Sequence, residues 1–143
     1  MNADWTRPYV GIPFVAKGRD FSGCDCGGLV LLALKVERGV IATDFEDYAA
    51  EDFADMRGVR KISRGIEAIM REWIVVEKPL PFDLCRFRYG REPFHYGVYV
   101  GRGQFLHVEK ALLFSRLTPL DDLDWGPRFI EFRRHERLMG APC

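Results

Sequence analysis

The sequence predicts an α+β protein in which helices come first and an antiparallel sheet of about five strands follows. Apolar residues recur with helical spacing between residues 26 and 73, and they alternate as in strands from residue 84 onward. No linker or low-complexity segment divides the 143 residues. Because a chain of this length can bury about 70% of its unfolded surface, we expect a single domain, 1–143, with one hydrophobic core.

The charge balance and the short apolar runs exclude several classes of protein. The 21 basic side chains equal the 21 acidic ones, whereas a general nucleic-acid binder needs a surplus of Lys and Arg. The longest uninterrupted apolar run, 29–34, has six residues, and a membrane span needs about 20. We therefore expect neither nucleic acid nor a membrane as a partner. No signal peptide is visible, which predicts synthesis in the cytoplasm.

The first helix is expected to start at Cys26. The preceding 25 residues are rich in Gly and Pro without a sustained period, which predicts a segment made mainly of loops. From Cys26 the apolar residues follow helical spacing, and Gly39 supplies a stop. Since the other faces of this helix are apolar too, we expect a central, buried helix that holds its first turn rigidly.

Two further helices are predicted, both with structural roles. The first follows the capping box Thr43-x-x-Glu46 and ends at Gly58, and the second runs from about Ser63 to Glu72. Each has an apolar stripe that we expect to face inward. The two stripes are Phe45, Tyr48, Ala49, Phe53 and Met56, and Ile62, Ile66, Ile69, Met70 and Trp73.

The strands are expected after Pro81, where the apolar period changes from helical to alternating. The stretch Thr118–Gly126 is expected to be a surface loop. The predicted strands are Leu84–Phe87, His95–Gly101, Gln104–Val108, Leu112–Leu117 and Arg128–Arg133.

Cys26 is the candidate nucleophile. A helix N-terminus lowers the pKa of a thiol, because free backbone N–H groups and the helix dipole favour the thiolate. The same N–H groups could form an oxyanion hole. Gly27 and Gly28 each cost about 1 kcal/mol relative to Ala in a helix, which indicates that something approaches closely there. The alternative is that Cys26 is a small buried hydrophobic residue.

Two histidines lie on a predicted hairpin whose register decides whether they share a face. A three-residue loop, Gly101–Gly103, sets Gly97 opposite His107 and places His95 diagonally from it, within about 7–8 Å. A two-residue loop would set Val98 opposite His107 and separate the histidines. In the shared-face register one histidine takes the thiol proton and the other orients it. The alternative is that both are ordinary strand residues.

These segments resemble the NlpC family of bacterial and phage cell-wall cysteine peptidases, a branch of the papain-like superfamily. The resemblance covers most of the chain and implies a papain-like fold with the nucleophile at the start of the central helix. Its motifs are Gly11-Ile12-Pro13-Phe14 with Gly18, then Gly23-Cys24-Asp25-Cys26-Gly27-Gly28-Leu29-Val30, then 83–87, and finally His95-x-Gly-Val-Tyr-Val-Gly before Phe105-Leu106-His107.

The resemblance implies a reaction and a catalytic triad. Cys26 would be the nucleophile, His95 the general base and His107 the orienting third member. The substrate would be a peptidoglycan stem peptide, cut between γ-D-glutamate and a diamino acid. The family's chemistry needs no metal and no cofactor.

The resemblance also implies three substrate contacts: Asp25, Phe14 and Gly27. Many family members carry a tyrosine at the position of Phe14 and a serine or tryptophan at that of Gly27. These departures leave the triad intact and bear on specificity and rate.

The short length, the Gly-Ile-Pro-Phe motif and the lack of a signal peptide or wall-binding repeats resemble the phage and prophage tail-associated branch. This implies a location in the virion tail, with tail-tip proteins as partners. The alternative is a structural tail-assembly protein with weak or latent activity. Phe14, which lacks a phenolic hydroxyl, favours it slightly, as does a basic run that is either an assembly surface or an ordinary solvated face. The run is Arg128, Arg133, Arg134 and Arg137.

A third alternative is a zinc-binding module. Tetrahedral coordination by two cysteines and two histidines is chemically permitted, but the spacing here is unlike the usual one. Its ligands would be Cys24, Cys26, His95 and His107. We expect thiols rather than disulfides, with a packing role for Cys24, no assigned role for Cys85, a mobile thiol at Cys143, and a surface position for His135.

Overall fold

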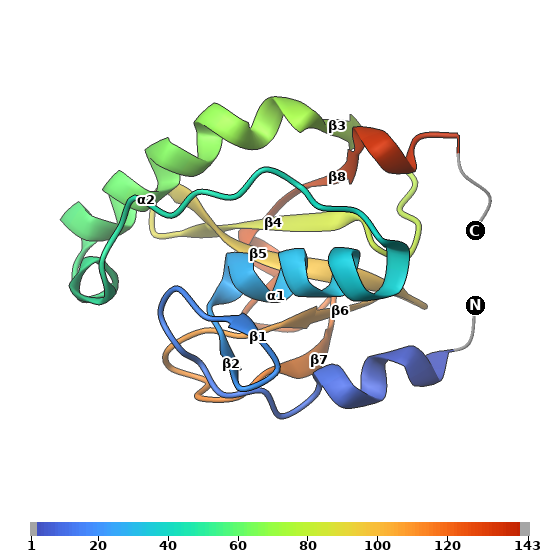
Figure 1. Ribbon diagram of the computed structural model, residues 1–143, viewed down its shortest axis with the longest axis horizontal. Helices are drawn as coiled ribbons and strands as arrows, with labels where there is room; N and C mark the ends of the chain where they lie inside the picture. Colours follow the sequence, from blue (N-terminus) through green and yellow to red (C-terminus); the bar gives the residue numbers. More distant parts are fainter. Residues whose placement is uncertain (1–2, 141–143) are drawn as a thin grey trace.

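The computed structural model describes residues 3–140 and confirms the α+β prediction. Its main sheet has six strands in the order β3-β8-β4-β5-β6-β7, and each neighbouring pair is antiparallel. In Figure 1, α1 crosses the middle of the sheet and α2 lies above it. Cys143, expected to be a mobile thiol, lies outside the described residues.

The elements follow one another in the order that the sequence predicted, helices before the main sheet. The helices are η1 (Ala3–Tyr9), α1 (Cys26–Ala33), η2 (Leu34–Arg38), η3 (Ala50–Phe53), α2 (Met56–Ile69), η4 (Met70–Glu72), η5 (Gly126–Arg128) and η6 (Glu136–Leu138). The strands are β1 (Arg19–Asp20), β2 (Gly23–Cys24), β3 (Trp73–Val76), β4 (Leu84–Tyr89), β5 (Glu92–Gly101), β6 (Gln104–His107), β7 (Arg116–Pro119) and β8 (Phe129–His135).

The central helix starts at Cys26, as predicted. Asp25 caps it by accepting a hydrogen bond of 2.8 Å from the N–H of Gly28. The helix continues as a π-helical turn and ends at Gly39, whose φ of 64° is left-handed. Leu29 and Leu34 are almost fully buried. The core therefore fixes the position of the first turn of α1.

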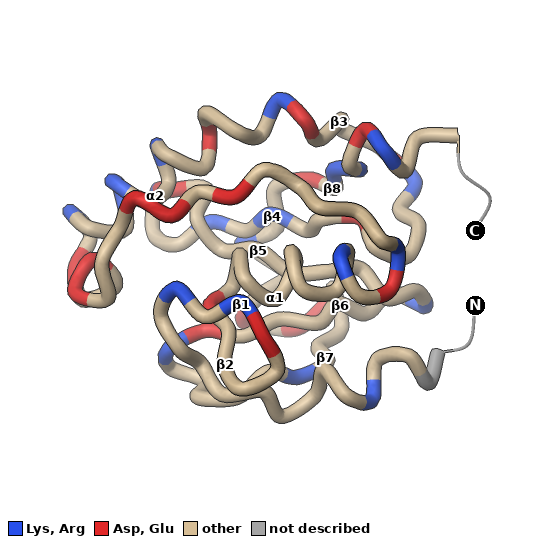
Figure 2. Tube along the Cα trace, in the orientation of Figure 1, with Lys and Arg blue, Asp and Glu red and all other residues tan. Residues whose placement is uncertain are grey.

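The helix predicted from the capping box at Thr43 is wrong. Residues 40–49 form no regular helix, because tertiary contacts hold this segment extended. The backbone N–H of Thr43 donates to a carboxylate oxygen of Glu72 at 3.2 Å, and Arg19 pairs with Asp44 at 2.9 Å. Figure 2 shows the acidic residues of this segment in red as it passes between α1 and α2.

The next helix, α2, starts earlier than expected, at Met56 rather than Ser63. Asp55 caps it by accepting from the N–H of Gly58 at 3.0 Å, so Gly58 lies in the first turn and does not end a helix. The inward stripe is confirmed, since Ile62 and Met70 are 2% and 4% exposed and the residues between them in the stripe, Ile66 and Ile69, are partly buried.

Four predicted strands are confirmed, as β4, β5, β6 and β8. The predicted strand Leu112–Leu117 pairs as β7 only from Arg116, and β7 extends to Pro119, into the expected surface loop. Two further features were not predicted: β3, which makes the sheet six-stranded, and the short β1–β2 hairpin.

The alternation of side chains along the strands divides the apolar residues into two clusters, one on each face of the sheet. In β4, Leu84 belongs to the large cluster that α1 and α2 cover, whereas Cys85 and Phe87 belong to a second cluster. Phe105 and Trp125 complete the buried part of that second cluster. The role of Cys85, which the sequence left open, is therefore packing.

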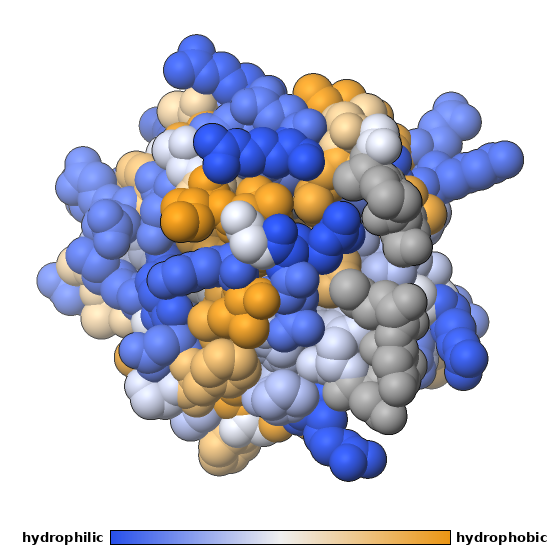
Figure 3. All heavy atoms as spheres, turned by 45° about the vertical axis from the view of Figure 1, so that its right-hand side comes forward, coloured by the Kyte–Doolittle hydropathy of each residue, from blue (hydrophilic) through white to orange (hydrophobic). Residues whose placement is uncertain are grey.

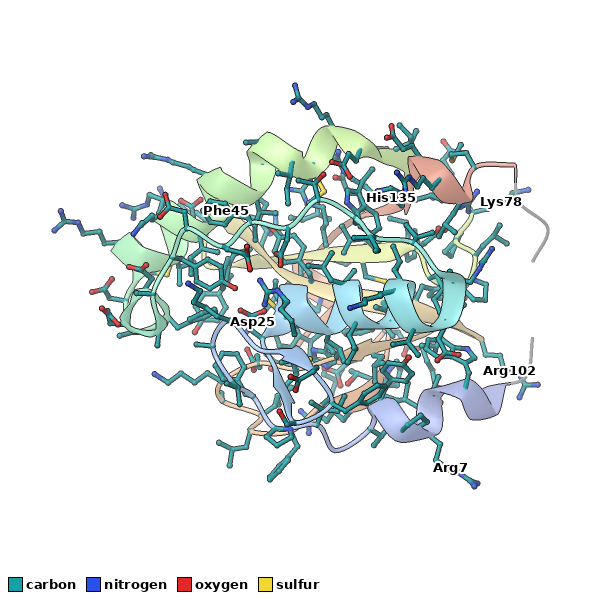
Figure 4. The ribbon with its side chains drawn as sticks, viewed as in Figure 1. Arg7, Asp25, Phe45, Lys78, Arg102 and His135 are labelled. Atoms are coloured by element: carbon teal, nitrogen blue, oxygen red, sulfur yellow. The ribbon has the colours of Figure 1, made fainter. Side chains whose placement is uncertain are left out.

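His135 is buried, contrary to the expected surface position. It is 1% exposed, its Nε2 lies 3.0 Å from Glu72 Oε1, and its ring packs edge-on against Trp73. Figure 4 labels it at the end of the sheet where β3 and β8 pair. The basic tail in sequence suggested exposure, but the pairing of β3 with β8 turns this side chain inward.

The predicted basic run is not an exposed positive face. Arg134 donates twice to Asp83 at 2.8 Å, Arg133 pairs with the carboxylate two residues before it, and Arg128 pairs with Asp124 at 3.1 Å. These pairs neutralise most of the run, which weakens its interpretation as an assembly surface. The face drawn in Figure 3 mixes hydrophobic and hydrophilic residues. Within residues 3–140 no helix has the length and apolar character that crossing a membrane requires.

Candidate active site

Cys26 lies at the first position of α1, against the backbone of β5. Its Sγ is 3.9 Å from the carbonyl oxygen of Phe94, and the backbone N–H groups of Gly27 and Tyr96 face the sulfur. Cys26 and His95 together line a groove of about 410 Å³. Cys26 is 5% exposed, and it also borders a second cavity, which Asp25 and Gly27 line with it.

The pKa of the Cys26 thiol is raised to about 12, the opposite of the expected direction. Burial is the largest cause, and the negative charge of Asp25 adds to it. The N–H groups of Tyr96 and Gly27 lower the pKa by less. The position of Cys26 at a helix start was predicted correctly, but desolvation of the thiol raises its pKa by more than the backbone N–H groups lower it. The resting residue is therefore a neutral thiol.

The hairpin register agrees with the shared-face prediction. Val98 pairs with Leu106 and Tyr99 with Phe105, which continues to Gly97 opposite His107. The expected three-residue loop is wrong, because Gly101 pairs with Gln104 and leaves only two loop residues. A bulge between Tyr99 and Gly101 keeps the strands in the predicted register. A Cβ atom on Gly97 would lie 3.3 Å from His107 Cβ. The missing side chain leaves room for the two imidazoles.

The two histidines contact each other directly and continue to a third residue. His95 Nε2 lies 2.8 Å from His107 Nδ1, and His107 Nε2 lies 2.8 Å from Thr118 Oγ1. We assign a proton to Nε2 of each ring, because this tautomer satisfies both hydrogen bonds and leaves His95 Nδ1 unprotonated. Thr118, expected in a surface loop, is buried. It is the outermost member of this hydrogen-bonded chain.

Burial keeps both imidazoles neutral. It lowers the pKa of His95 well below its ordinary value, and the neighbouring His107 and Arg128 act in the same direction. The pKa of His107 falls to about 3, again chiefly because of burial. A neutral His107 retains the Nδ1 lone pair that accepts from His95. The site therefore rests as a thiol and two neutral rings.

Trp125 holds the ring of His95 from one side. The two rings stack with centroids 4.3 Å apart and planes 28° apart, and Trp125 is 2% exposed. Its edge also faces His107 at 5.1 Å. The sequence analysis placed Trp125 in a surface loop. A large aromatic residue among the polar residues of that segment was the available signal, since loops rarely expose tryptophan.

Asp25 is buried at the centre of a hydrogen-bond cluster. One carboxylate oxygen accepts from the N–H of Gly28 and from Arg19 at 2.7 Å, and the other accepts from the N–H of Lys17 and from the hydroxyl of Tyr48. Figure 4 labels Asp25 at the first turn of α1. Each carboxylate oxygen of Asp25 therefore already accepts two hydrogen bonds from groups of the protein. Its predicted contact with substrate stays a prediction.

The other two predicted substrate contacts also border the thiol. Phe14 lines the groove with Cys26, its ring edge-on to Phe53. A Cβ atom on Gly27 would meet no neighbour closer than 3.9 Å, so the space beside it is open. By contrast, a Cβ on Gly28 would lie 2.0 Å from the carbonyl oxygen of a glycine in the preceding loop. Gly27 thus leaves space for a molecule that approaches from outside, whereas Gly28 allows close packing against the preceding loop.

The zinc alternative does not match the geometry. Among residues 3–140 no group of three or more His, Cys, Asp or Glu side chains is arranged to hold a metal ion. His95 and His107 bond to each other, and Cys24 Sγ donates to the carbonyl oxygen of Asp20 at 3.2 Å. Cys24 is fully buried in the main apolar cluster, as the expected packing role requires.

A model of the NlpC/P60 family matches residues 11–134. The chain belongs to the NlpC/P60 family. None of the curated proteins compared with it matched. Several solved structures share its fold, including the following three.

NlpC2 from Trichomonas vaginalis has a TM-score of 0.65 at 18% identity, covering 93% of this chain and 44% of its own. An NlpC/P60 family protein from Bacillus cereus ATCC 10987 has 0.64 at 20% identity, covering 94% and 40%. The NlpC/p60 domain of the peptidoglycan hydrolase SagA has 0.55 at 20% identity, covering 94% and 98%. The present chain thus spans less than half the length of the first two.

The NlpC/P60 site contains the parts that acyl transfer requires. A thiol and an imidazole with a free nitrogen line one groove, and His107 fixes the orientation of that imidazole. The N–H groups of Gly28 and Leu29 are taken by Asp25, which leaves those of Cys26 and Gly27 at the helix start. Of these two, the N–H of Gly27 faces the sulfur, beside which an oxyanion would form.

Proposed function

We propose that this NlpC/P60 domain is a cysteine endopeptidase that hydrolyses peptidoglycan stem peptides at the bond between γ-D-glutamate and a diamino acid. The observation that carries the proposal is the shared groove of Cys26 and His95, with His95 hydrogen-bonded to His107. The resemblance of the nucleophile and histidine motifs supports the choice of bond. The name of one similar structure, a peptidoglycan hydrolase, supports the substrate class.

The first half-reaction forms a thioester. Since the resting thiol is neutral, its proton moves to His95 Nδ1 as Sγ bonds to the γ-glutamyl carbonyl carbon. The carbonyl oxygen gains the negative charge, which the N–H groups of Cys26 and Gly27 stabilise. Collapse of this intermediate breaks the C–N bond, and His95 gives its proton to the leaving amine of the diamino acid.

The second half-reaction releases the acid. A water molecule gives a proton to His95 while its oxygen attacks the thioester carbonyl, and the C–S bond then breaks with return of the proton to Cys26. His107 stays neutral throughout, because its pKa of about 3 is far below that of an ordinary histidine. Its Nδ1 therefore accepts a hydrogen bond from His95 in both the imidazole and the imidazolium form.

The test is release of amino groups from purified stem peptides, with mass identification of the fragments. We expect new amino termini at the diamino acid with wild type and none with Cys26→Ala. Cys85→Ala is the matched control, because Cys85 is buried in the second apolar cluster and should leave cleavage intact. Cleavage by Cys26→Ala, or cleavage only at another bond, would contradict the proposal.

We also propose that the domain is made in the cytoplasm and reaches the wall as part of a phage tail, where tail-tip proteins are its partners. The resemblance of the Gly11-Ile12-Pro13-Phe14 motif supports this setting. Mass spectrometry of purified virions from the strain that encodes the chain is the test. Its peptides should be present in isolated tails, and their absence from intact virions would reject the proposal.

A further inference from the structure

A second, larger hollow adjoins the groove that holds Cys26. Three residues, Tyr89, Glu109 and Ala111, line both the groove that holds Cys26 and a hollow of about 860 Å³. The two spaces are therefore adjacent, and a substrate bound at the thiol would have the second hollow beside it.

The second hollow lies on the leaving-group side of the bond to be cut. Its lining comes from the turn between β4 and β5, from the segment after β6, and from residues 124–128. No residue of α1 or of the loops before it lines this second hollow. The leaving amine takes its proton from His95, so the part of the substrate that departs must lie toward the elements that carry the histidines.

Two charged side chains of this hollow, Glu109 and Arg91, form no ion pair with the described part of the chain. Glu109 is partly buried where the two spaces meet, and its carboxylate forms neither an ion pair nor a hydrogen bond with any residue in the range 3–140. Burial raises its pKa, and the nearby positive charges of Arg128 and Arg116 only partly offset the cost of burying the carboxylate. A ligand ammonium group would relieve that cost.

The three arginines of the hollow differ in whether their guanidinium groups have a partner within the protein. Arg128 pairs with Asp124 and covers the ring of Trp125, and Arg88 donates to the carbonyl oxygen of Pro127 at 3.0 Å. Arg91, at the same rim, forms no ion pair with the described part of the chain. A guanidinium group in this state can bind a carboxylate in a bidentate manner.

We propose that Glu109 and Arg91 form the subsite for the leaving group, whose first residue carries a side-chain ammonium group bound by Glu109, and which carries a nearby carboxylate bound by Arg91. The inference rests on the proposed function and deepens it. It assigns the recognition of a diamino acid to two named residues of the histidine side. A neutral side chain of the same length would leave Glu109 unpaired.

Binding of product-like dipeptides tests the subsite without any cleavage. The probes are lysyl-D-alanine, norleucyl-D-alanine, which lacks the side-chain ammonium group, and lysyl-D-alaninamide, which lacks the carboxylate. Calorimetric titration of wild type should show about tenfold weaker binding for the norleucyl probe, since the contact to Glu109 is partly buried. For the amide we expect about threefold, because Arg91 is exposed.

Variants then assign each preference to its residue. Glu109→Gln should remove the preference for lysyl over norleucyl and keep the preference for the acid over the amide, and Arg91→Gln should do the reverse. Glu136→Gln and Arg7→Gln are the matched controls at exposed positions outside the hollow. Figure 4 shows Arg7 pointing away from the protein. Both controls should bind all three probes as wild type does.

Failure of the subsite and failure of the proposed function are distinguishable. Equal binding of the three probes to wild type, or preferences that survive in Glu109→Gln and Arg91→Gln, would overturn the subsite even if stem peptides are cleaved. Charge-selective binding that each variant abolishes would support the subsite. If stem peptides were then not cleaved, only the proposed reaction would be rejected.

Discussion

Lowering the pH from 7.5 to 5.0 is expected to reduce the free energy of unfolding through His107. This side chain is fully buried, and its pKa is about 3 in the fold compared with 6.5 for an ordinary histidine. As the pH falls below 6.5, the unfolded chain takes up a proton at this position and the folded chain does not. The stabilisation is thus complete above pH 6.5 and is lost as the pH falls toward 3.

The magnitude follows from the separation of the two pKa values. Each pH unit between them changes the free energy of unfolding by about 1.4 kcal/mol. At pH 5.0 the unfolded state is favoured by about 2 kcal/mol relative to pH 7.5. His95 acts in the same direction, since its pKa is also lowered by burial. Carboxylates such as Glu72 and Glu131, with lowered pKa values, titrate mainly below pH 5.

Urea denaturation followed by tryptophan fluorescence measures the effect at both pH values. The comparison is with His107→Gln, which keeps an amide able to accept from His95 but cannot be protonated. We expect the loss of stability between pH 7.5 and 5.0 to be smaller in the variant by about 2 kcal/mol. An equal loss in wild type and variant would show that His107 does not stay neutral in the fold, and the reasoning would be refuted.

Three further predictions concern the surroundings of the histidines. Gly97→Ala should destabilise the fold by about 1–3 kcal/mol in urea titrations, because its Cβ would lie 2.9 Å from the Phe105 ring; an unchanged midpoint would contradict the hairpin packing. Thr118→Val should cost a similar amount, because it leaves the buried Nε2–H of His107 without an acceptor, whereas Thr118→Ser should restore stability. Trp125→Leu should move the acid limb of the kcat/KM profile to higher pH, because exposing His95 lets its lowered pKa rise toward 6.5; a limb that stays in place would argue against desolvation by Trp125.

Much of the local structure followed from short-range patterns. The start of α1 was predictable because the apolar period and the flanking residues are all within one helical length. Gly97 opposite His107 was predicted correctly, although the predicted three-residue turn was wrong, because a bulge between Tyr99 and Gly101 offsets the shorter turn. The incorrect helix at Thr43 shows the limit of such signals. Its capping box is genuine in sequence, but contacts to Glu72 and Arg19 hold the segment extended.

The sequence by itself determined the α+β class, the thiol at a helix start and two histidines on one face of a hairpin. Only the tertiary structure decided their chemistry. Burial reverses the expected shift of the Cys26 pKa, and Trp125 and Thr118, from an expected surface loop, enclose the histidines. The physical reason is that patterns of period and turn are local, whereas desolvation is a sum over neighbours that the chain brings together from distant positions.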